Sequence, residues 1–205
     1  SLGISPDVLV CRSEQELPKD EKKKIALFCS VPNESVISMH DVDTVYTVPI
    51  LLNKQKVDKT IIEKLKIKAK QPNLNDWKRV VKAKLMPEKE VNVSFVGKYT
   101  ELKDSYKSIN EALEHAGIKN KAKVNINFVE AENISSKNIK KTLKNADAVL
   151  VPGGFGERGI EGMILACKYA RENNIPYLGI CLGMQVAIIE YARNVLNLKG
   201  ANSTE

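Results

Sequence analysis

Residues 175–194 read IPYLGICLGMQVAIIEYARN, and this stretch decides the class of fold. The short apolar run over 175–180 is typical of a buried strand, whereas 184–194 has the apolar spacing of a helix. Only a few residues around Gly179-Ile-Cys-Leu-Gly183 join the two, so the strand must turn sharply into the helix. Such strand–turn–helix units build the parallel sheets of α/β proteins.

The preceding sequence repeats this alternation in units of about thirty residues, the usual length of a strand–helix–strand unit. Strands are predicted over 91–97, 123–129 and 146–151, and helices over 104–116, 135–144 and 160–173. Together with 175–194, four strands alternate with four helices. This pattern predicts an α/β fold with a parallel sheet that helices cover on both faces.

The first part of the chain has a weaker pattern. Strands are expected over 7–11 and 36–39, and helices over 18–29, 57–65 and 77–84. Two strands are too few to enclose a core of their own. We therefore expect residues 1–66 to be the end of one domain, 67–90 to be a basic linker, and 91–205 to be the beginning of a second domain.

The net charge of +7 is confined to one stretch. Residues 54–90 hold twelve Lys/Arg against five Asp/Glu, and the rest of the chain is balanced. Trp77 is the one aromatic residue there, so bases and stacking rings do not alternate as in a nucleic-acid binder. A solvated helical linker is favoured, an anionic partner such as a nucleotide phosphate is the alternative, and a salt-sensitive nucleic-acid binder is the least favoured class.

Composition and cysteine spacing exclude several other classes. The chain is 43% apolar and 28% charged, the balance of a globular protein, and no apolar run is long enough to span a membrane. The N-terminus lacks the pattern of a signal peptide. Cysteines at 11, 29, 167 and 181 form no C-x-x-C pair, which argues against a disulfide framework and a zinc site. We expect a cytoplasmic protein with no metal site in these residues.

Cys181 occupies the centre of a G-x-C-x-G sequence, the thiol counterpart of the nucleophile elbow. A residue on so sharp a turn projects at the carboxyl edge of the sheet, and the flanking glycines let neighbouring backbone pass. The first amides of the helix favour the thiolate, and that of Leu182 can stabilise an oxyanion. The alternative is a buried cysteine at a tightly packed turn.

A second glycine-rich loop leaves the same edge of the predicted sheet. The strand over 146–151 is followed by Pro152-Gly-Gly-Phe-Gly156, with Gly159 and Gly162 close behind. Ligands of α/β proteins bind at the carboxyl ends of the strands. An unobstructed Gly153-Gly154 pair can present backbone amides to an anion, which favours an oxyanion loop over a simple turn with positive φ.

Several segments together resemble the CTP synthase family. LVPGGFGERGIEGM, ARENNIPYLGICLGMQVAIIEYARN, ANSTE and VGKYTELKDSYKSINEAL are similar to its glutaminase domain, a class I glutamine amidotransferase with a flavodoxin-like sheet. PDVLVCRSE, KIALFC and VISMHDVDTVY resemble the end of its P-loop-type, ATP-dependent synthetase domain. The family uses ATP and Mg2+ to phosphorylate the 4-oxygen of UTP, and ammonia from glutamine displaces the phosphate to give CTP. The resemblance also implies GTP as allosteric activator, a homotetramer, and no nucleic-acid or membrane partner.

The resemblance assigns roles by position. Cys181 would be the nucleophile that forms a glutamyl thioester. The oxyanion and glutamine-binding positions would be Gly153, Gly154, Leu182, Gly183, Met184, Gln185 and Glu205. Lys24 would meet the pyrimidine nucleotide, and His40, Asp41 and Val42 the adenine of ATP. The family often has a lysine in place of His40, and the residues alone would make Lys24 a solvated helix lysine.

The predicted site contains no base for the Cys181 thiol. A cysteine nucleophile needs a base, usually a histidine oriented by a carboxylate. His115 lies late in a predicted helix, about 15 Å back from the carboxyl edge at ~1.5 Å per residue, and His40 belongs to the other domain. In the family the His–Glu pair follows ANSTE, and the phosphate-binding loop and magnesium carboxylates precede Ser1. We therefore expect an internal fragment, inactive by itself; a non-catalytic binding or assembly module is the alternative.

Overall fold

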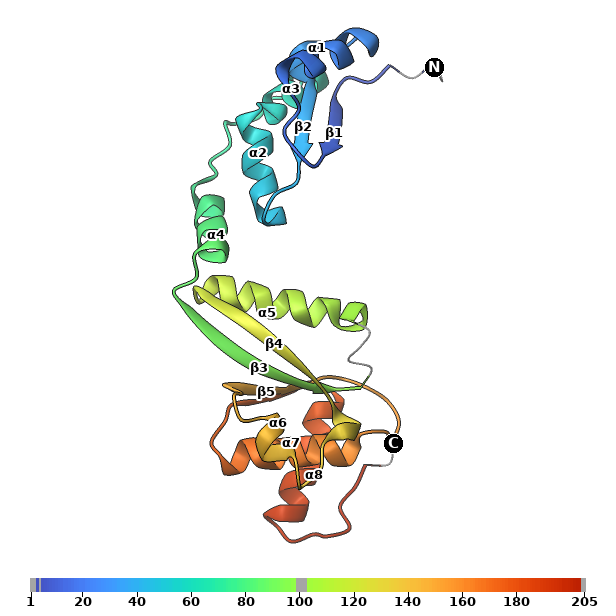
Figure 1. Cartoon of the computed structure of the whole chain (residues 1–205), viewed down its shortest axis with the longest axis vertical. Helices are drawn as coiled ribbons and strands as arrows, with labels where there is room; N and C mark the ends of the chain where they lie inside the picture. The colour runs from blue at the N-terminus through green and yellow to red at the C-terminus, as the bar shows by residue number, and fades with distance from the viewer. Residues whose placement is uncertain (1–2, 4, 99–102, 204–205) are drawn as a thin grey trace. The chain divides into compact units, whose positions relative to one another are not determined.

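The computed structural model describes residues 3, 5–98 and 103–203. The chain divides into two compact units between Leu85 and Met86, inside the stretch 67–90 predicted as a linker (Figure 1). None of the helices in these described ranges has the length and apolar character needed to cross a bilayer.

The first unit contains a pair of parallel strands, β1 (Leu9–Ser13) and β2 (Val36–His40). Its helices are α1 (Lys19–Phe28), α2 (Val48–Lys54), α3 (Val57–Leu65) and α4 (Asn75–Leu85), with short 3-10 turns at Asn33–Ser35 and Val45–Thr47. The predicted strands and helices are confirmed to within two residues. The sequence reading missed α2, which is only two turns long and begins with Pro at its first turn.

The side chain of Gln55 forms hydrogen bonds with the backbone of β2, as a neighbouring strand would. Gln55 follows α2; its Nε2 donates to the carbonyl of Ser38 (2.8 Å), and its Oε1 accepts from the Ser38 amide (3.0 Å). Ser38 is fully buried, so these bonds satisfy backbone groups that water cannot reach. The end of α2 is thereby fixed against the strand that leads to His40.

The second unit is built on a parallel four-stranded sheet in the order β4-β3-β5-β6. The strands are β3 (Lys89–Gly97), β4 (Ala122–Glu130), β5 (Ala148–Val151) and β6 (Tyr177–Gly179). The helices are α5 (Lys107–Lys119), α6 (Ile139–Thr142), α7 (Ile160–Glu172) and α8 (Leu182–Asn194), with 3-10 turns at Lys103–Tyr106 and Ala131–Asn133. In chain order the strands run 2-1-3-4, as in flavodoxin-like sheets, so the predicted α/β class is confirmed.

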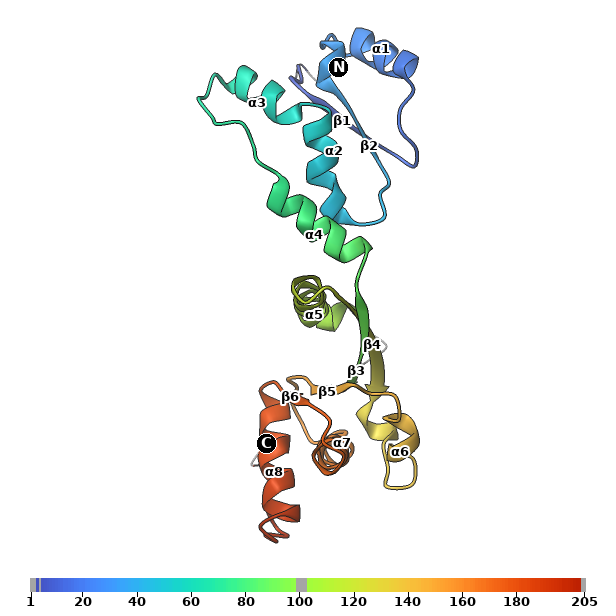
Figure 2. The ribbon, with the colours of Figure 1, turned by 90° about the vertical axis from the view of Figure 1, so that its left-hand side faces the viewer.

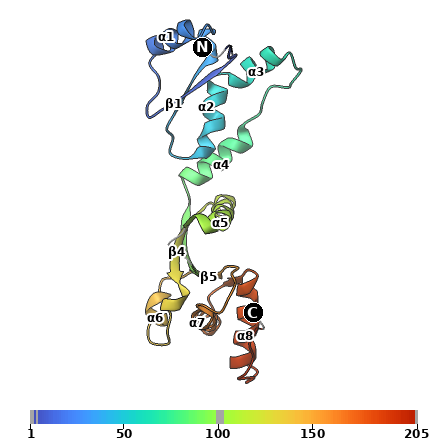
Figure 3. The ribbon, with the colours of Figure 1, turned by 90° about the vertical axis from the view of Figure 1, so that its right-hand side faces the viewer.

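Both faces of this sheet are covered, as predicted. Figures 2 and 3 show α5 on one side of β3 and β4 and α6 on the other. Phe95, fully buried, anchors the face under α5 and stacks edge-on against Tyr106. The opposite face packs mainly against α7 and α8 through buried aliphatic residues, among them Val96, Val129, Val149, Val151, Met163, Ala166, Val186 and Ile189.

One predicted helix is much shorter than expected. The segment 135–144 forms only a single helical turn, α6 (Ile139–Thr142). The Asn138 side chain accepts from the Ser135 amide (2.8 Å) and donates to the Asn133 carbonyl (2.7 Å). Because this side chain satisfies backbone groups in a turn, the helix cannot begin before it.

Candidate active site

The turn that carries Cys181 has the backbone geometry of a nucleophile elbow. Cys181 lies between β6 and α8 with φ 52° and ψ −104°, a conformation that residues with a side chain rarely adopt. Its side chain is exposed. The strained residue therefore stands at the carboxyl edge of the sheet, at the N-terminus of a thirteen-residue helix.

The two glycines that flank Cys181 are required by close backbone packing. A Cβ on Gly179 would lie 2.4 Å from the carbonyl carbon of Gly183. A Cβ on Gly183 would lie 2.1 Å from the carbonyl oxygen of Val151, at the end of β5. The sequence-based expectation that these glycines let backbone pass is confirmed, and no other residue fits at either position without displacing the chain.

The first turn of α8 leaves one amide beside the thiol. Met184 and Gln185 donate their amides to the Cys181 carbonyl (3.0 and 3.2 Å), and Gly183 donates to Ile180 (3.0 Å). The Leu182 amide has no acceptor among the residues that the structure describes. Of these helix-start amides, that of Leu182 is the one that remains available to an anion formed next to Cys181.

The glycine loop after β5 lies against the elbow. A Cβ on Gly153 would be 3.5 Å from the Cβ of Cys181, and one on Gly154 would be 3.3 Å from a methyl group of Leu182. Gly156 and Gly159 have positive φ (75° and 74°), whereas Gly153 and Gly154 do not. The turn geometry therefore requires glycine at positions 156 and 159. It does not require glycine at 153 and 154, where the absence of side chains leaves the backbone accessible next to the Cys181 thiol.

Lys98 holds this loop and was missed by the sequence reading. It follows β3 and is only 4% exposed; its Nζ donates to the carbonyls of Phe155 (2.8 Å) and Gly156. Burial, and then the charge of Arg158, lower the pKa of Lys98. Its own carbonyl accepts from the hydroxyl of Tyr106. A buried cation bonded to two loop carbonyls fixes the path of the glycine loop. Its position directly after a strand, at the carboxyl edge, is the signal that sequence reading could have used.

A partly buried tyrosine supports the elbow from beneath. Tyr177 in β6 donates its hydroxyl to the Gly183 carbonyl (2.7 Å), and burial raises the pKa of Tyr177. The neighbouring Cys167 in α7 is 6% exposed, and burial raises the pKa of its thiol to about 11. Cys167 is therefore a packing residue, in contrast to the exposed Cys181.

A buried carboxylate joins the two helices on this face. Glu190 in α8 is 1% exposed and accepts from Arg171 in α7; the shortest bonds are 3.0 Å from Nε and 2.8 Å from the terminal nitrogen Nη2. The two-pronged geometry satisfies both carboxylate oxygens and fixes the helices relative to each other. Because α8 carries Cys181 at its start, this pair also restrains the thiol's position.

The predicted nucleotide-binding residues all belong to the first unit. His40 ends β2 and is followed by Asp41 and Val42, and the Nδ1 of His40 is buried with no partner among the described residues. Asp41 forms an exposed ion pair with Arg12 (2.7 Å). Lys24 lies on α1, exposed and paired with Glu21 (3.1 Å). The structure thus brings His40, Asp41 and Val42 together and leaves Lys24 on a helix surface.

Two further expectations concern a base and a metal. His115 lies on α5, nearer its C-terminal end, and His40 lies in the other unit. In the described ranges, no group of three or more His, Cys, Asp or Glu residues is arranged to hold a metal ion. The predicted Glu205 lies outside the described residues.

Comparison with known proteins identifies the family. Residues 101–204 match the family model of class I glutamine amidotransferases, and residues 1–67 match that of the CTP synthase N-terminus. Among solved structures, the chain is similar to the glutaminase domain of Trypanosoma brucei CTPS with bound acivicin. The two are 43% identical with a TM-score of 0.53, over 56% of this chain and 45% of that one.

The chain therefore belongs to the class I glutamine amidotransferase family. Within that family, both the N-terminal match and the solved structure are those of CTP synthases, so the resemblance read from the sequence is confirmed. The chain spans less than half of the length of the solved glutaminase domain that it matches.

Alanine in place of Gly183 should destabilise the second unit by about 2 kcal/mol or more, since over-packing of this kind typically costs 1–3 kcal/mol. The new methyl group would collide with the Val151 carbonyl. Gly153→Ala is the matched control: its methyl group meets Cys181 at ordinary contact distance, so stability should change by less than about 0.5 kcal/mol. Urea unfolding followed by circular dichroism measures both, and equal midpoints for the two variants would contradict the packing described here.

Alkylation should distinguish the two cysteines of the second unit. At pH 8, iodoacetamide should modify the exposed Cys181 well before Cys167. With a pKa of about 11, roughly one Cys167 thiol in a thousand is ionised at that pH, and the fraction rises about a hundredfold by pH 10. Peptide mass spectrometry gives both rates, with urea-unfolded protein as the control. Equal rates in the folded chain would show that Cys167 is not shielded.

Proposed function

We propose that the second unit carries the nucleophile and oxyanion loop of a glutaminase that feeds ammonia to CTP synthesis. The observation that carries the proposal is the strained, exposed Cys181 held against the Gly153-Gly154 loop. Glutamine, which the family hydrolyses, is the proposed substrate. Gly183, Met184, Gln185 and Glu205 are proposed to complete the glutamine-binding surface.

In the proposed reaction, the Sγ of Cys181 bonds to the carboxamide carbon of glutamine. The carbonyl oxygen becomes an oxyanion that accepts from the Leu182 amide and from the open backbone at Gly153 and Gly154. One such donor is worth roughly 10²–10³ in rate. The oxyanion then collapses to a carbonyl, the C–N bond breaks, and the nitrogen takes the proton that the thiol has lost, so that ammonia leaves and a thioester remains. Water attacks the thioester, releases glutamate and restores the thiol.

For the first unit we propose a part in the ATP-dependent amination of UTP to CTP. The match of residues 1–67 to the CTP synthase N-terminus supports this proposal. His40, Asp41 and Val42 are proposed to contact ATP, and Lys24 the pyrimidine nucleotide. ATP with Mg2+ would phosphorylate UTP in that reaction. GTP activation, a homotetramer and a cytoplasmic location belong to the same proposal.

A non-catalytic binding or assembly module is the second candidate. It is favoured by the positions of the two histidines, neither of which lies on the elements that form the elbow and its loop. The two candidates differ in one property. A glutaminase site binds a glutamine analogue at Cys181, and a mere assembly surface does not.

Acivicin, bound in the similar structure, should label Cys181 of the 205-residue chain, and Cys181→Ala should abolish the labelling. Lys98→Met frees the glycine loop and should slow labelling at least about tenfold, a loss of ~1.4 kcal/mol of transition-state stabilisation. Lys98→Arg should restore part of the rate. Mass spectrometry measures the label.

The iodoacetamide rate at Cys181 is the control for these variants, because it reports thiol exposure without requiring the oxyanion loop. It should stay within about twofold in Lys98→Met, as expected when a substitution does not unfold the turn. Labelling of Cys29 in preference to Cys181, or equal acivicin rates in Lys98→Met and the unmodified chain, would remove the glutaminase proposal.

The 205-residue polypeptide should release almost no ammonia from glutamine. Within the second unit the one histidine, His115, lies nearer the C-terminal end of α5, and a cysteine nucleophile without a base turns over slowly. A coupled ammonia assay tests this expectation, with Cys181→Ala as the blank. Release at ordinary enzyme rates that depends on Cys181 would show that another group in the chain serves as base.

A further inference from the structure

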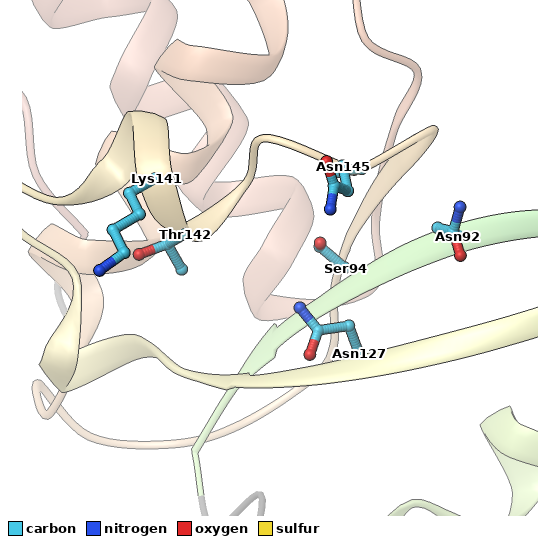
Figure 4. A pocket seen from close by; sticks show the side chains of 7 residues that line it. Asn92, Ser94, Asn127, Lys141, Thr142 and Asn145 are labelled. Atoms are coloured by element: carbon cyan, nitrogen blue, oxygen red, sulfur yellow. The ribbon is translucent and has the colours of Figure 1, made fainter.

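A polar pocket lies on the sheet of the second unit, away from the elbow. It has a volume of about 250 Å³. Its polar lining comes from β3, β4, α6 and the segment between α6 and β5: Asn92, Ser94, Asn127, Lys141, Thr142 and Asn145 (Figure 4). These residues lie in the middle of β3 and before the start of β5, whereas Cys181 and the glycine loop follow the carboxyl ends of their strands.

The pocket exists because α6 is only one turn long. On this face of β3, Asn92 and Ser94 alternate with the buried Val93 and Phe95, which point to α5. The next residue on the pocket face is Val96, which packs into the apolar core with α7 and α8. A full helix over 135–144 would fill this space, whereas the short α6 leaves a pocket that Asn92 and Ser94 of β3 line.

Ser94 is the most deeply buried of the polar residues that line the pocket. It is only 3% exposed, and its hydroxyl has no hydrogen-bond partner among the described residues. This hydroxyl is not among the fully buried side-chain atoms that lack a partner, so its small exposed area opens onto the pocket, where a ligand or water can bond to it. Figure 4 shows the side chains of Ser94, Asn127 and Asn145 turned toward one another.

The other lining groups set the chemistry of that ligand. Asn127, Asn145 and Lys141 have no partner within the described part of the chain, so two amides and one ammonium group can donate. Asn92 is occupied, since it donates to Asp147 (3.0 Å) and accepts from Asn125 (3.2 Å). No carboxylate lines the pocket. Asp147, which does not line the pocket, is bonded to both the backbone amide and the side-chain amide of Asn92.

We propose that this pocket binds a small anion through its carboxylate or phosphate oxygens. Ser94, Asn127 and Asn145 would donate to the oxygens, and Lys141, on the α6 side, would supply the positive charge. Lysine is a common phosphate ligand, and bonds with an ionised partner are the stronger ones. The pocket is smaller than the roughly 300–1,000 Å³ of sites for drug-sized ligands, which restricts it to small anions. The site is independent of the glutaminase proposal.

NMR titration of the 205-residue chain tests the proposal with two probes, inorganic phosphate and malonate, at constant ionic strength. Saturable shifts are expected for the side-chain amides of Asn127 and Asn145 below about 20 mM of one probe, a range typical of millimolar affinity. Saturation by phosphate alone identifies a phosphate site, and saturation by malonate alone identifies a carboxylate site. If neither probe gives saturable shifts at these amides, the proposal is wrong.

Variants distinguish binding in the pocket from non-specific attraction to positive charge. Lys141→Gln and Ser94→Ala should each weaken the better probe about tenfold, a change equal to one decade in Kd. Lys140→Gln is the matched control, because it removes the same charge from the neighbouring exposed residue, which does not line the pocket. Asn145→Ala, at an exposed position, provides a second test should Ser94→Ala fail to fold. Equal weakening by Lys140→Gln and Lys141→Gln would mean non-specific attraction and would overturn the proposal.

Discussion

The carbonyl oxygen of Val151 is the point on which the candidate site depends. It accepts the amide of Ile180 at 2.9 Å, which ties the strand before Cys181 to the end of β5. The first turn of α8 then passes so close that a Cβ on Gly183 would lie 2.1 Å from this oxygen. Because the chain continues from Val151 directly into Pro152 and Gly153, the same contact also places the glycine loop beside the thiol. The close approach of the start of α8 to the end of β5 therefore fixes the positions of both Cys181 and the glycine loop.

Hydrogen bonds of buried and partly buried polar groups hold this arrangement from two sides. Beneath the elbow, Tyr177 bonds to the Gly183 carbonyl, and the Glu190–Arg171 pair fixes α8 against α7. Beside it, Lys98 bonds to the carbonyls of the glycine loop. Each of these groups is largely buried or pairs with a buried partner, so loss of one leaves another unsatisfied. The strain at Cys181 is maintained because its surroundings leave the turn no alternative path.

The same sheet offers two unlike surfaces. At the carboxyl ends of the strands, glycines bring backbone amides close to a reactive side chain, as is usual next to the point where the strand order reverses. Midway along β3, a helix of a single turn leaves a polar pocket lined by Ser94 and its asparagine neighbours. The first surface follows from the topology that all such sheets share. The second depends on Asn138, a single residue that keeps the α6 helix short.

The sequence by itself determined the alternation of strands and helices, the parallel sheet, the elbow and the adjacency of the two loops. Hydrophobic periodicity and glycine spacing are local, and parallel strands bring their carboxyl ends to one edge. Only the tertiary structure decided which glycines serve packing and which serve the site, because close approach of Gly183 to Val151 joins residues far apart in the chain. It alone decided which loop carbonyls Lys98 bonds to, and the length of α6, since both depend on where side chains find partners in the fold.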